Sequence, residues 1–300
     1  MQVRAEDLAF VARFVEELCG VVLDDSKAYL VESRLGRLAQ DHGCSSYREL
    51  CERARRSGDP ALRTQIIDAI TTHETLFFRD QAPFDALQFR VLPDLIDART
   101  RAKAPRRLRF WSAACSTGQE PYSIAITLCE TLPDRNAWNL FIVATDISDA
   151  AIQKASRGWY APYEIQRGMK PALLAKYFVP KNGGYQVRDE LRAMVAFRRR
   201  NLLEPFDDLG LFDVIFCRNV AIYFDPAKRR DMFLRLARQL VPDGVLFVGS
   251  AESLLDLGPR FAPHNHCRAT FYRPNMPLGS GVARTAATPL AAIQPALPRR

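Results

Sequence analysis

The sequence predicts an α/β protein with a doubly wound, Rossmann-like sheet, a helical domain before the sheet and a small antiparallel β subdomain inserted into it. Three observations predict this architecture. Helical periodicity without strand-like runs fills the first 90 residues, whereas short apolar runs alternate with helices over residues 108–273. Within the second region, residues 108–127 read as a buried strand that turns sharply into a helix opening at Pro121. Open α/β sheets bind nucleotides at such turns, and the alternative is an ordinary βα unit without a ligand.

The composition is that of a globular protein with reduced cysteines. With 300 residues, 48% of them apolar, the chain can fill a large core. It has no apolar run of membrane-spanning length, its first residues do not resemble a signal peptide, and its seven cysteines form no CxxC pair. We therefore expect a cytoplasmic protein without membrane insertion. The net charge of +8 favours an acidic partner, which could be nucleic acid, a membrane surface or a protein.

Residues 1–90 are predicted to form the helical domain. Apolar residues fall at helical spacing from Ala5 onward, and a further helix is expected at about residues 84–98. A basic, loop-like stretch follows that helix and ends at Arg107. It predicts a domain boundary, with a linker over residues 91–107.

Residues 108–273 are predicted to form the doubly wound domain. Its apolar runs show little alternation, as expected of parallel strands that are buried on both faces. A last run at residues 269–273 predicts an edge strand beside the strand expected at residues 245–250. The predicted strands span residues 108–114, 140–145, 213–217 and 245–250, with helices at 121–131, 149–157 and 226–240.

Two segments stand apart from this alternation. The turn signal Lys181-Asn182-Gly183-Gly184 lies between two β-like runs, so a small β insertion is expected at about residues 158–200. Residues 274–300 are rich in Pro, Ala, Gly and Ser and contain no acidic residue, which predicts a disordered tail.

Asp146 closes the second predicted strand, roughly thirty residues after the first turn. Nucleotide-binding βαβ units place an acidic residue there, because a carboxylate can accept hydrogen bonds from both ribose hydroxyls. The alternative role for Asp146 is to cap the helix that follows.

The turn after the first strand predicts a ligand without phosphate. It has one glycine, Gly118, and lacks the GxGxxG pattern that seats a pyrophosphate. Glu120, at the start of the helix, would repel phosphate but suits a positively charged ligand. S-adenosylmethionine carries an ammonium and a sulfonium group and no phosphate, so this turn favours methyl transfer over hydride transfer.

Other stretches place polar residues near predicted strand ends. TTHETLFFRD, residues 71–80, reads either as two core phenylalanines with an ion pair between its last two residues, or as a polar lip facing the sheet. Arg218 and Asn219 end a buried strand, where ligands bind in this architecture, and Tyr223 follows them. Asn201 follows the β insertion and could end a further strand near the pocket.

Two patterns are interpreted as unrelated to the site. The HNHC stretch with His264, His266 and Cys267 lacks a second cluster to complete a metal site, so we expect a loop and no metal. The run Arg198-Arg199-Arg200 has few of the interleaved aromatic residues that nucleic-acid binding uses. We therefore expect a solvated face and no nucleic-acid partner.

Together these motifs resemble the chemotaxis receptor methyltransferases, the CheR family. With the helical N-terminus they cover about residues 5–273, in the family's order. The resemblance implies a class I methyltransferase domain that uses S-adenosylmethionine and releases S-adenosylhomocysteine. It also implies that the acceptors are glutamate side chains on the cytoplasmic helices of methyl-accepting chemoreceptors. The matching stretches are TTHETLFFRD, FWSAACSTGQEPYSIAI, ATDIS, the NLL at Asn201, and FDVIFCRNVAIYFD.

The resemblance also assigns residues by position. Arg79 and Tyr223 would lie closest to the transferred methyl group. A basic helix that the family uses for its substrate corresponds to Lys27, Arg34 and Arg37. The implied cofactor-binding residues are His73, Thr75, Arg79, Glu120, Asp146, Asn201, Leu202, Arg218 and Asn219.

The chain departs from the family pattern at two places. His73 stands where the family often has asparagine, and an imidazole reproduces only part of an amide's hydrogen bonding. The hairpin at Gly183 is shorter than in members that dock onto a receptor's C-terminal peptide, which argues against such a tether. Two other functions stay open: a methyltransferase of the same fold acting on RNA or a small molecule, and a catalytically silent cofactor-binding interaction module.

Overall fold

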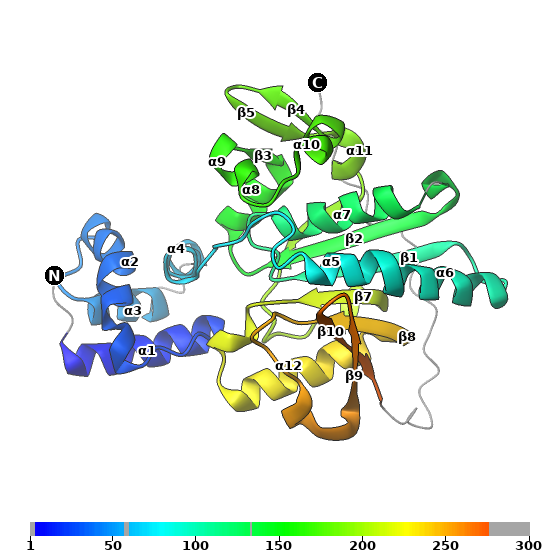
Figure 1. Cartoon of the computed structure of the whole chain (residues 1–300). Helices are drawn as coiled ribbons and strands as arrows, with labels where there is room; N and C mark the ends of the chain where they lie inside the picture. Colours follow the sequence, from blue (N-terminus) through cyan, green and yellow to red (C-terminus); the bar gives the residue numbers. More distant parts are fainter. Residues whose placement is uncertain (1–3, 57–59, 133, 276–300) are drawn as a thin grey trace.

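The structure is a computed structural model that describes residues 4–56, 60–132 and 134–275 (Figure 1). Nearly all of the predicted disordered tail, namely residues 276–300, lies outside the described residues. None of the helices in the three described ranges has the length and hydropathy that a membrane span requires.

The first helices form a lobe beside the sheet, drawn in blue in Figure 1. Apolar residues four positions apart, such as Val11 and Val15, are fully buried in a hydrophobic core whose buried residues all belong to this lobe. The elements of the helical lobe are α1 (Ala5–Cys19), the 3-10 turn η1 (Asp25–Lys27), α2 (Ala28–Asp41), α3 (Tyr47–Arg56) and α4 (Pro60–Ile70).

The helices after the lobe pack on the sheet. They are α5 (Ala82–Ala86), the π-helical turn η2 (Leu87–Val91) and α6 (Leu92–Arg101). The segment that we predicted as a linker, residues 91–107, is therefore mostly helical. Leu92 is fully buried in the core that the sheet strands share, and Pro93 lies in the first turn of α6, where a missing N–H is tolerated. We propose to place the domain boundary between α4 and α5.

A seven-stranded mixed sheet lies at the centre of the rest of the chain, in the order β6-β2-β1-β7-β8-β10-β9. Its first five strands in this order are parallel. They are β1 (Arg107–Ala113), β2 (Asn139–Asp146), β6 (Val195–Arg199), β7 (Phe212–Cys217) and β8 (Leu240–Phe247). All residues of β7 are buried, as expected of a strand covered on both faces.

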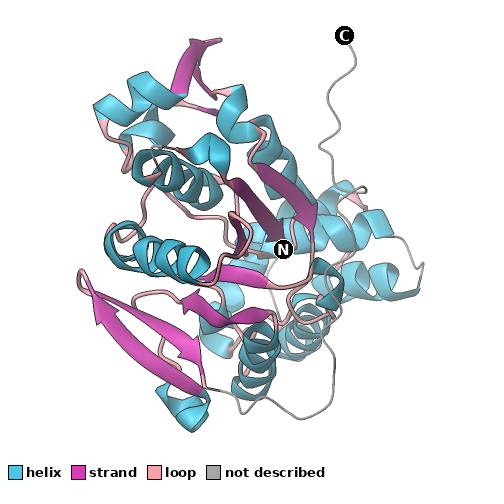
Figure 2. Ribbon diagram, turned by 90° about the vertical axis from the view of Figure 1, so that its right-hand side faces the viewer, coloured by secondary structure: helices cyan, strands magenta, loops and turns pink. Residues whose placement is uncertain are grey.

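Helices cover both faces of this sheet, as Figure 2 shows for the central strands. One hydrophobic core holds apolar residues of α5, α6 and α7, and a second core on the other face holds those of α12. The connecting elements are α7 (Gln119–Thr131), η3 (Arg135–Ala137), α8 (Asp149–Arg157), η4 (Asp207–Leu209), η5 (Ala221–Tyr223), α12 (Pro226–Arg238) and η6 (Leu255–Arg260).

The C-terminal end of the sheet is a hairpin. β10 (Ala269–Pro274) lies beside β8, as predicted, and runs antiparallel to it. It is not the edge strand, because β9 (Phe261–His266) pairs with its other side. The loop predicted for HNHC is wrong, since His264 and His266 lie in β9. The strand forms because Phe261 is buried and the His264 ring stacks on Phe271. Within the described ranges, no three His, Cys, Asp or Glu side chains are grouped so as to hold a metal.

The predicted insertion forms a three-stranded antiparallel sheet in the order β3-β5-β4. Its elements are β3 (Trp159–Tyr160), α9 (Pro162–Gln166), α10 (Pro171–Tyr177), β4 (Phe178–Lys181), β5 (Gly184–Val187) and α11 (Asp189–Arg192). Asn182 and Gly183 both have positive φ, 49° and 73°, as a tight hairpin turn requires. The second β-like run, residues 194–200, is not part of this small sheet. It forms β6 at the edge of the main sheet, where Val195 is buried opposite Ile142 of β2.

Candidate functional site

The carboxyl ends of β1, β2 and β7 and the adjoining loops of the helical lobe enclose a pocket. Every residue that the sequence assigned to the cofactor or to the transferred methyl group lines it, and so does Lys27. The structure thus brings together side chains from six separate stretches of the chain. The assigned residues that line the pocket are His73, Thr75, Arg79, Glu120, Asp146, Asn201, Leu202, Arg218, Asn219 and Tyr223.

The turn between β1 and α7 forms one wall of the pocket with a strained backbone. Ala114 and Ser116 both have positive φ, 62° and 50°, which non-glycine residues rarely adopt. Gly118 precedes α7 at φ 97°, and a Cβ on it would lie 2.8 Å from both the Ala155 Cβ and the Tyr160 hydroxyl. A glycine is therefore required here for the close approach of α8, and the strain is concentrated at the ligand-facing turn.

Asp146 lies at the end of β2 with its carboxylate held by the backbone. Its Oδ2 accepts the Ser116 N–H at 2.8 Å and its Oδ1 accepts the Ser148 N–H at 3.0 Å. The cap of α8 is Ser148, whose hydroxyl accepts the Ala151 N–H at 3.0 Å. Burial raises the pKa of the Asp146 carboxyl, although these hydrogen bonds and His73 oppose the rise. Because Ser148 caps the helix, the remaining lone pairs of Asp146 are available to a ligand.

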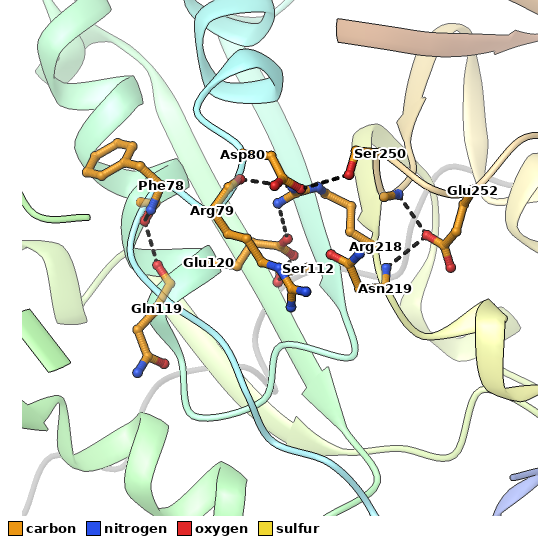
Figure 3. Close-up of polar contacts among 12 residues, drawn as sticks. Phe78, Arg79, Asp80, Ser112, Gln119, Glu120, Arg218, Asn219, Ser250 and Glu252 are labelled. Carbon is orange, nitrogen blue, oxygen red and sulfur yellow. Dashed lines mark hydrogen bonds and ion pairs between the residues drawn. The ribbon is translucent and has the colours of Figure 1, made fainter. Parts of the chain in front are cut away.

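Glu120 and Arg218 form a buried ion pair across the pocket floor (Figure 3). The Arg218 Nη1 lies 3.2 Å from Glu120 Oε2, and the Ser112 hydroxyl donates to Glu120 Oε1 at 2.7 Å. Burial raises the pKa of the Glu120 carboxyl and Arg218 lowers it. Arg218 also pairs with Asp80 at 2.9 Å. One guanidinium thus serves two carboxylates, which leaves a net negative charge that suits a cationic ligand.

The stretch TTHETLFFRD combines both of its predicted roles. Phe77 and Phe78 are buried in the core of the sheet, whereas His73, Thr75 and Arg79 line the pocket. The predicted ion pair between its last two residues is absent, because Asp80 pairs with Arg218, as described above, while the Arg79 guanidinium donates to the Glu74 carbonyl at 3.1 Å.

The orientation of His73 is fixed by two neighbours. Its Nε2 lies 2.9 Å from the Thr71 hydroxyl, which donates its own hydrogen to the Ile67 carbonyl at 2.7 Å. A hydroxyl has one hydrogen, so His73 Nε2 is the donor in this contact. The His73 carbonyl accepts from the Ser116 hydroxyl at 3.0 Å, which ties the helical lobe to the β1 turn.

Glu252 is a buried carboxylate beside the site that the sequence analysis did not single out. It follows β8, and its Oε2 accepts the backbone N–H of Asn219 at 2.8 Å (Figure 3) and that of Gly249 at 2.7 Å. Its Oε1 accepts the backbone N–H of Ala221 at 3.0 Å. The only sequence signal was an acidic residue shortly after the last parallel strand, which has no specific meaning without the partners.

The helical lobe closes the pocket through backbone contacts that no motif indicated. The Val22 N–H donates to the Tyr223 carbonyl at 2.9 Å, and Val21 forms an isolated antiparallel bridge with Phe224. The Asn201 side chain donates to the Leu18 carbonyl at 3.3 Å. The turn that carries Tyr223 is therefore shared between the lobe and the sheet.

The three basic residues predicted to contact a substrate lie in different environments. Lys27 lines the pocket and pairs with Asp24 at 3.2 Å. Arg34 donates to the carbonyls of Ile70 and Thr71 at 3.0 and 2.8 Å, so it satisfies the end of α4. The Arg37 side chain is 92% exposed, with a 3.8 Å contact to Asp41.

Comparison with known proteins gives two family matches and close relatives. A family model described as the all-alpha domain of CheR methyltransferase matches residues 6–71, and one described as its SAM binding domain matches residues 73–268. The chain is 44% identical to chemotaxis protein methyltransferase 1 of Pseudomonas aeruginosa, over 81% of this chain and 89% of the relative. It is 43% identical to chemotaxis protein methyltransferase Cher2 of Pseudomonas putida, over 80% and 88%. A Vibrio cholerae chemotaxis protein methyltransferase 1 is 40% identical, over 83% and 90%.

Proposed function

Because the chain belongs to the CheR methyltransferase family, we propose that it methylates glutamate side chains of methyl-accepting chemoreceptors during chemotaxis. Its cofactor is S-adenosylmethionine, in keeping with the SAM binding domain of the family. The products would be glutamate methyl esters and S-adenosylhomocysteine. The relatives' names support a role in chemotaxis, and the glutamate acceptor and a cytoplasmic site of action are our proposal.

The chemistry of the pocket fits this cofactor. Asp146 offers carboxylate lone pairs at the strand end where ribose hydroxyls bind, and the Glu120, Asp80 and Arg218 group carries a net negative charge. When bound, S-adenosylmethionine supplies an electrophilic methyl group on a sulfonium. We propose that Asn201, Leu202, Asn219, His73 and Thr75 complete its binding surface, since they line the same pocket.

The proposed glutamate acceptor is supported by the interactions of the Arg79 guanidinium. Four Lys and Arg side chains line the pocket in the described part of the chain. Lys27, Arg200 and Arg218 each pair with a carboxylate. The hydrogen bond described for Arg79 is to a backbone carbonyl. Among the described residues Arg79 has no ion-pair partner, so its guanidinium is suited to orient an incoming carboxylate.

The acceptor needs little chemical activation. A glutamate side chain has a reference pKa of about 4.3 and is already an anionic nucleophile at neutral pH. The protein therefore contributes positioning and exclusion of water, and no general base is required. We propose that Arg79 holds the acceptor carboxylate and that Tyr223, on the turn shared with the helical lobe, shapes the passage to the transferred methyl group.

Receptor docking is proposed to use the basic residues of the helical lobe. Lys27 is at the pocket and Arg37 is free to meet an acidic receptor helix, which would steer association. Arg34 has a structural role at the end of α4 as well, so any effect of its removal on methylation would combine two causes.

The experiment that tests the function is transfer of tritiated methyl groups to co-expressed receptor, followed by alkali treatment. Glutamate esters release methanol in base, whereas N-methyl groups do not. Arg79→Ala is expected to lose transfer by tenfold or more while retaining S-adenosylhomocysteine binding within a few-fold. Arg106→Ala is the matched control, because Arg106 is an exposed arginine just before the amino end of β1, whereas the pocket lies at the carboxyl end.

The outcomes separate the alternatives. Base-stable tritium label in RNA or in a small molecule would show that the acceptor is not a receptor glutamate. Cofactor binding without any transferred methyl group would indicate a silent interaction module. Wild-type turnover in Arg79→Ala would remove Arg79 from the transfer position.

A further inference from the structure

We propose that Glu252 is the positioning residue of the transfer site, with one carboxylate oxygen setting Asn219 and the other setting the turn that carries Tyr223. The inference deepens the proposed function, because it takes Asn219 as a cofactor contact and Tyr223 as a methyl-passage residue. It assigns a role to a side chain that does not line the pocket itself.

The two oxygens of Glu252 have different partners. Oε2 accepts two backbone N–H groups, from Asn219 at 2.8 Å and from Gly249 at 2.7 Å. Oε1 accepts the N–H of Ala221, the first residue of η5, at 3.0 Å. The carboxylate therefore joins the carboxyl ends of the neighbouring strands β7 and β8 and is buried between them.

The backbone that Glu252 holds is strained. Asn219 has φ 58°, a left-handed conformation that asparagine tolerates better than most residues but that still costs free energy. Gly249 makes the close approach possible, because a Cβ there would lie 2.7 Å from Asn219 Nδ2 and 2.8 Å from Glu252 Oε2. Strain of this kind persists only where the surroundings hold it, and the charge-assisted hydrogen bonds that Glu252 accepts do so.

Glu252 is itself fixed on both sides. Its own N–H donates to the Gly249 carbonyl at 2.9 Å, which closes the turn after β8. Two residues later, the Leu254 N–H donates to the Tyr272 hydroxyl at 3.3 Å, and Arg229 of α12 donates to the Ser253 carbonyl. The backbone that carries Glu252 is thus held by the sheet and by α12, which is what a positioning role requires.

The division of partners between the oxygens makes the role testable with a conservative variant. In Glu252→Gln, the amide oxygen can take the place of Oε2 and accept from both Asn219 and Gly249. The amide NH₂ then faces the Ala221 N–H, and two donors cannot form a hydrogen bond with each other. This variant keeps the contacts to Asn219 and Gly249 and loses the contact at η5. In Glu252→Ala all three N–H groups lose their partner.

We therefore expect a split between binding and turnover. Glu252→Gln should bind S-adenosylhomocysteine within threefold of the wild type by calorimetry, but its kcat for receptor methylation should fall tenfold or more. Glu252→Ala should weaken S-adenosylhomocysteine binding by tenfold or more and also lose turnover. Asp213→Asn is the matched control, since Asp213 is a buried carboxylate at the opposite end of β7 that accepts the Arg109 N–H at 2.7 Å. It should lower the Tm without changing the Kd or the kcat.

The inference is overturned if Glu252→Ala lowers the Tm as Asp213→Asn does while its Kd and kcat stay within twofold of the wild type. It is equally overturned if Glu252→Gln changes neither quantity, or changes only the Kd. If Glu252→Ala does not fold, the Gln variant alone decides. A wild-type protein that forms no base-labile esters would remove the proposed function, but the calorimetric comparison would still test whether Glu252 sets the cofactor side of the site.

Discussion

Replacing Arg218 by methionine is expected to lower the free energy of unfolding by about 3–5 kcal/mol, because the change leaves a carboxylate buried without its cation. The Arg218 side chain is 1% exposed and that of its partner Glu120 is 12% exposed. Methionine retains an unbranched apolar stem beside the Phe84 ring, so most of the loss comes from the stranded charge.

Substituting the other member of the pair, Glu120, is expected to reduce stability much less. Glu120→Gln removes one charge-assisted hydrogen bond, at a cost of about 1.5 kcal/mol, while Arg218 keeps its contacts with Asp80 and the Arg79 carbonyl. In the Arg218→Met background the same change should instead stabilise the protein, by about 1–3 kcal/mol, because it neutralises the stranded carboxylate. The effect of Glu120→Gln thus changes sign between the two backgrounds.

The pH dependence follows from the same pair. Burial raises the pKa of the Glu120 carboxyl and Arg218 is the largest influence that lowers it, so removing Arg218 raises that pKa further. A carboxyl whose pKa is higher in the folded state favours folding when protonated, and this contribution is lost as the pH rises through the folded pKa. The loss of unfolding free energy in Arg218→Met should therefore become smaller as the pH is lowered toward 4.5, the ordinary pKa of this carboxyl in the unfolded chain.

Urea unfolding followed by far-UV circular dichroism, at neutral pH and near pH 5, measures these quantities for the wild type, the two single variants and the double variant. Arg106→Met is the control, because Arg106 is 59% exposed in its ion pair with Asp134 and should change stability by less than about 1 kcal/mol. Additive effects of the two substitutions, within about 0.5 kcal/mol, would refute the idea that the buried pair dominates.

Three further predictions concern single positions. Gly118→Ala should destabilise the protein by about 1 kcal/mol more than Gly43→Ala in thermal unfolding, because both glycines have positive φ but a Cβ has free space at Gly43. Asp146→Asn should weaken S-adenosylhomocysteine binding at least tenfold in calorimetry, whereas Ser148→Ala should cost about 1 kcal/mol of stability with little effect on binding. Arg37→Ala should leave the Tm unchanged and reduce the salt dependence of receptor methylation, and an unchanged salt dependence would exclude Arg37 from docking.

The sequence was informative wherever short-range patterns decide structure. Buried parallel strands, the turn at Gly118 and the acidic residue at Asp146 are local features, and the structure places them as predicted at the carboxyl end of the sheet. The ten assigned pocket residues could be gathered because a motif order, and not any single motif, indicated the family.

The errors have a common physical origin in long-range pairing. Val195–Arg199 alternates like a hairpin strand, and nothing local shows that it pairs with β2 about fifty residues earlier. The HNHC segment is polar, yet it forms β9 because its neighbours Phe261 and Phe271 are buried. The stretch at residues 99–107 looks basic and loop-like, but α6 continues to Arg101, and Arg99 forms ion pairs with Asp213 and Asp243 that composition alone does not indicate.

The sequence analysis did not single out Glu252 for the same reason, because its partners lie far away along the chain or in the backbone. Glu252 acquires its importance from three backbone N–H groups, two of them in the loop after β7 and one in its own turn after β8. Backbone donors leave no trace in side-chain identity, so a residue that satisfies them cannot be distinguished in sequence from any other acidic loop residue.

The backbone bond between Val22 and Tyr223 has a consequence for how the protein unfolds. The helical lobe and the sheet have separate hydrophobic cores, and they are linked by polar contacts such as that of Asn201 with Leu18, by the ion pair of Lys228 with Glu16, and by Ile147, which packs against the core of the lobe. A cofactor bound in that pocket touches both parts, and at a hundred times its Kd it stabilises the joined state by about 2.7 kcal/mol. Added S-adenosylhomocysteine should therefore act as a reversible cross-link, merging two melting transitions into one.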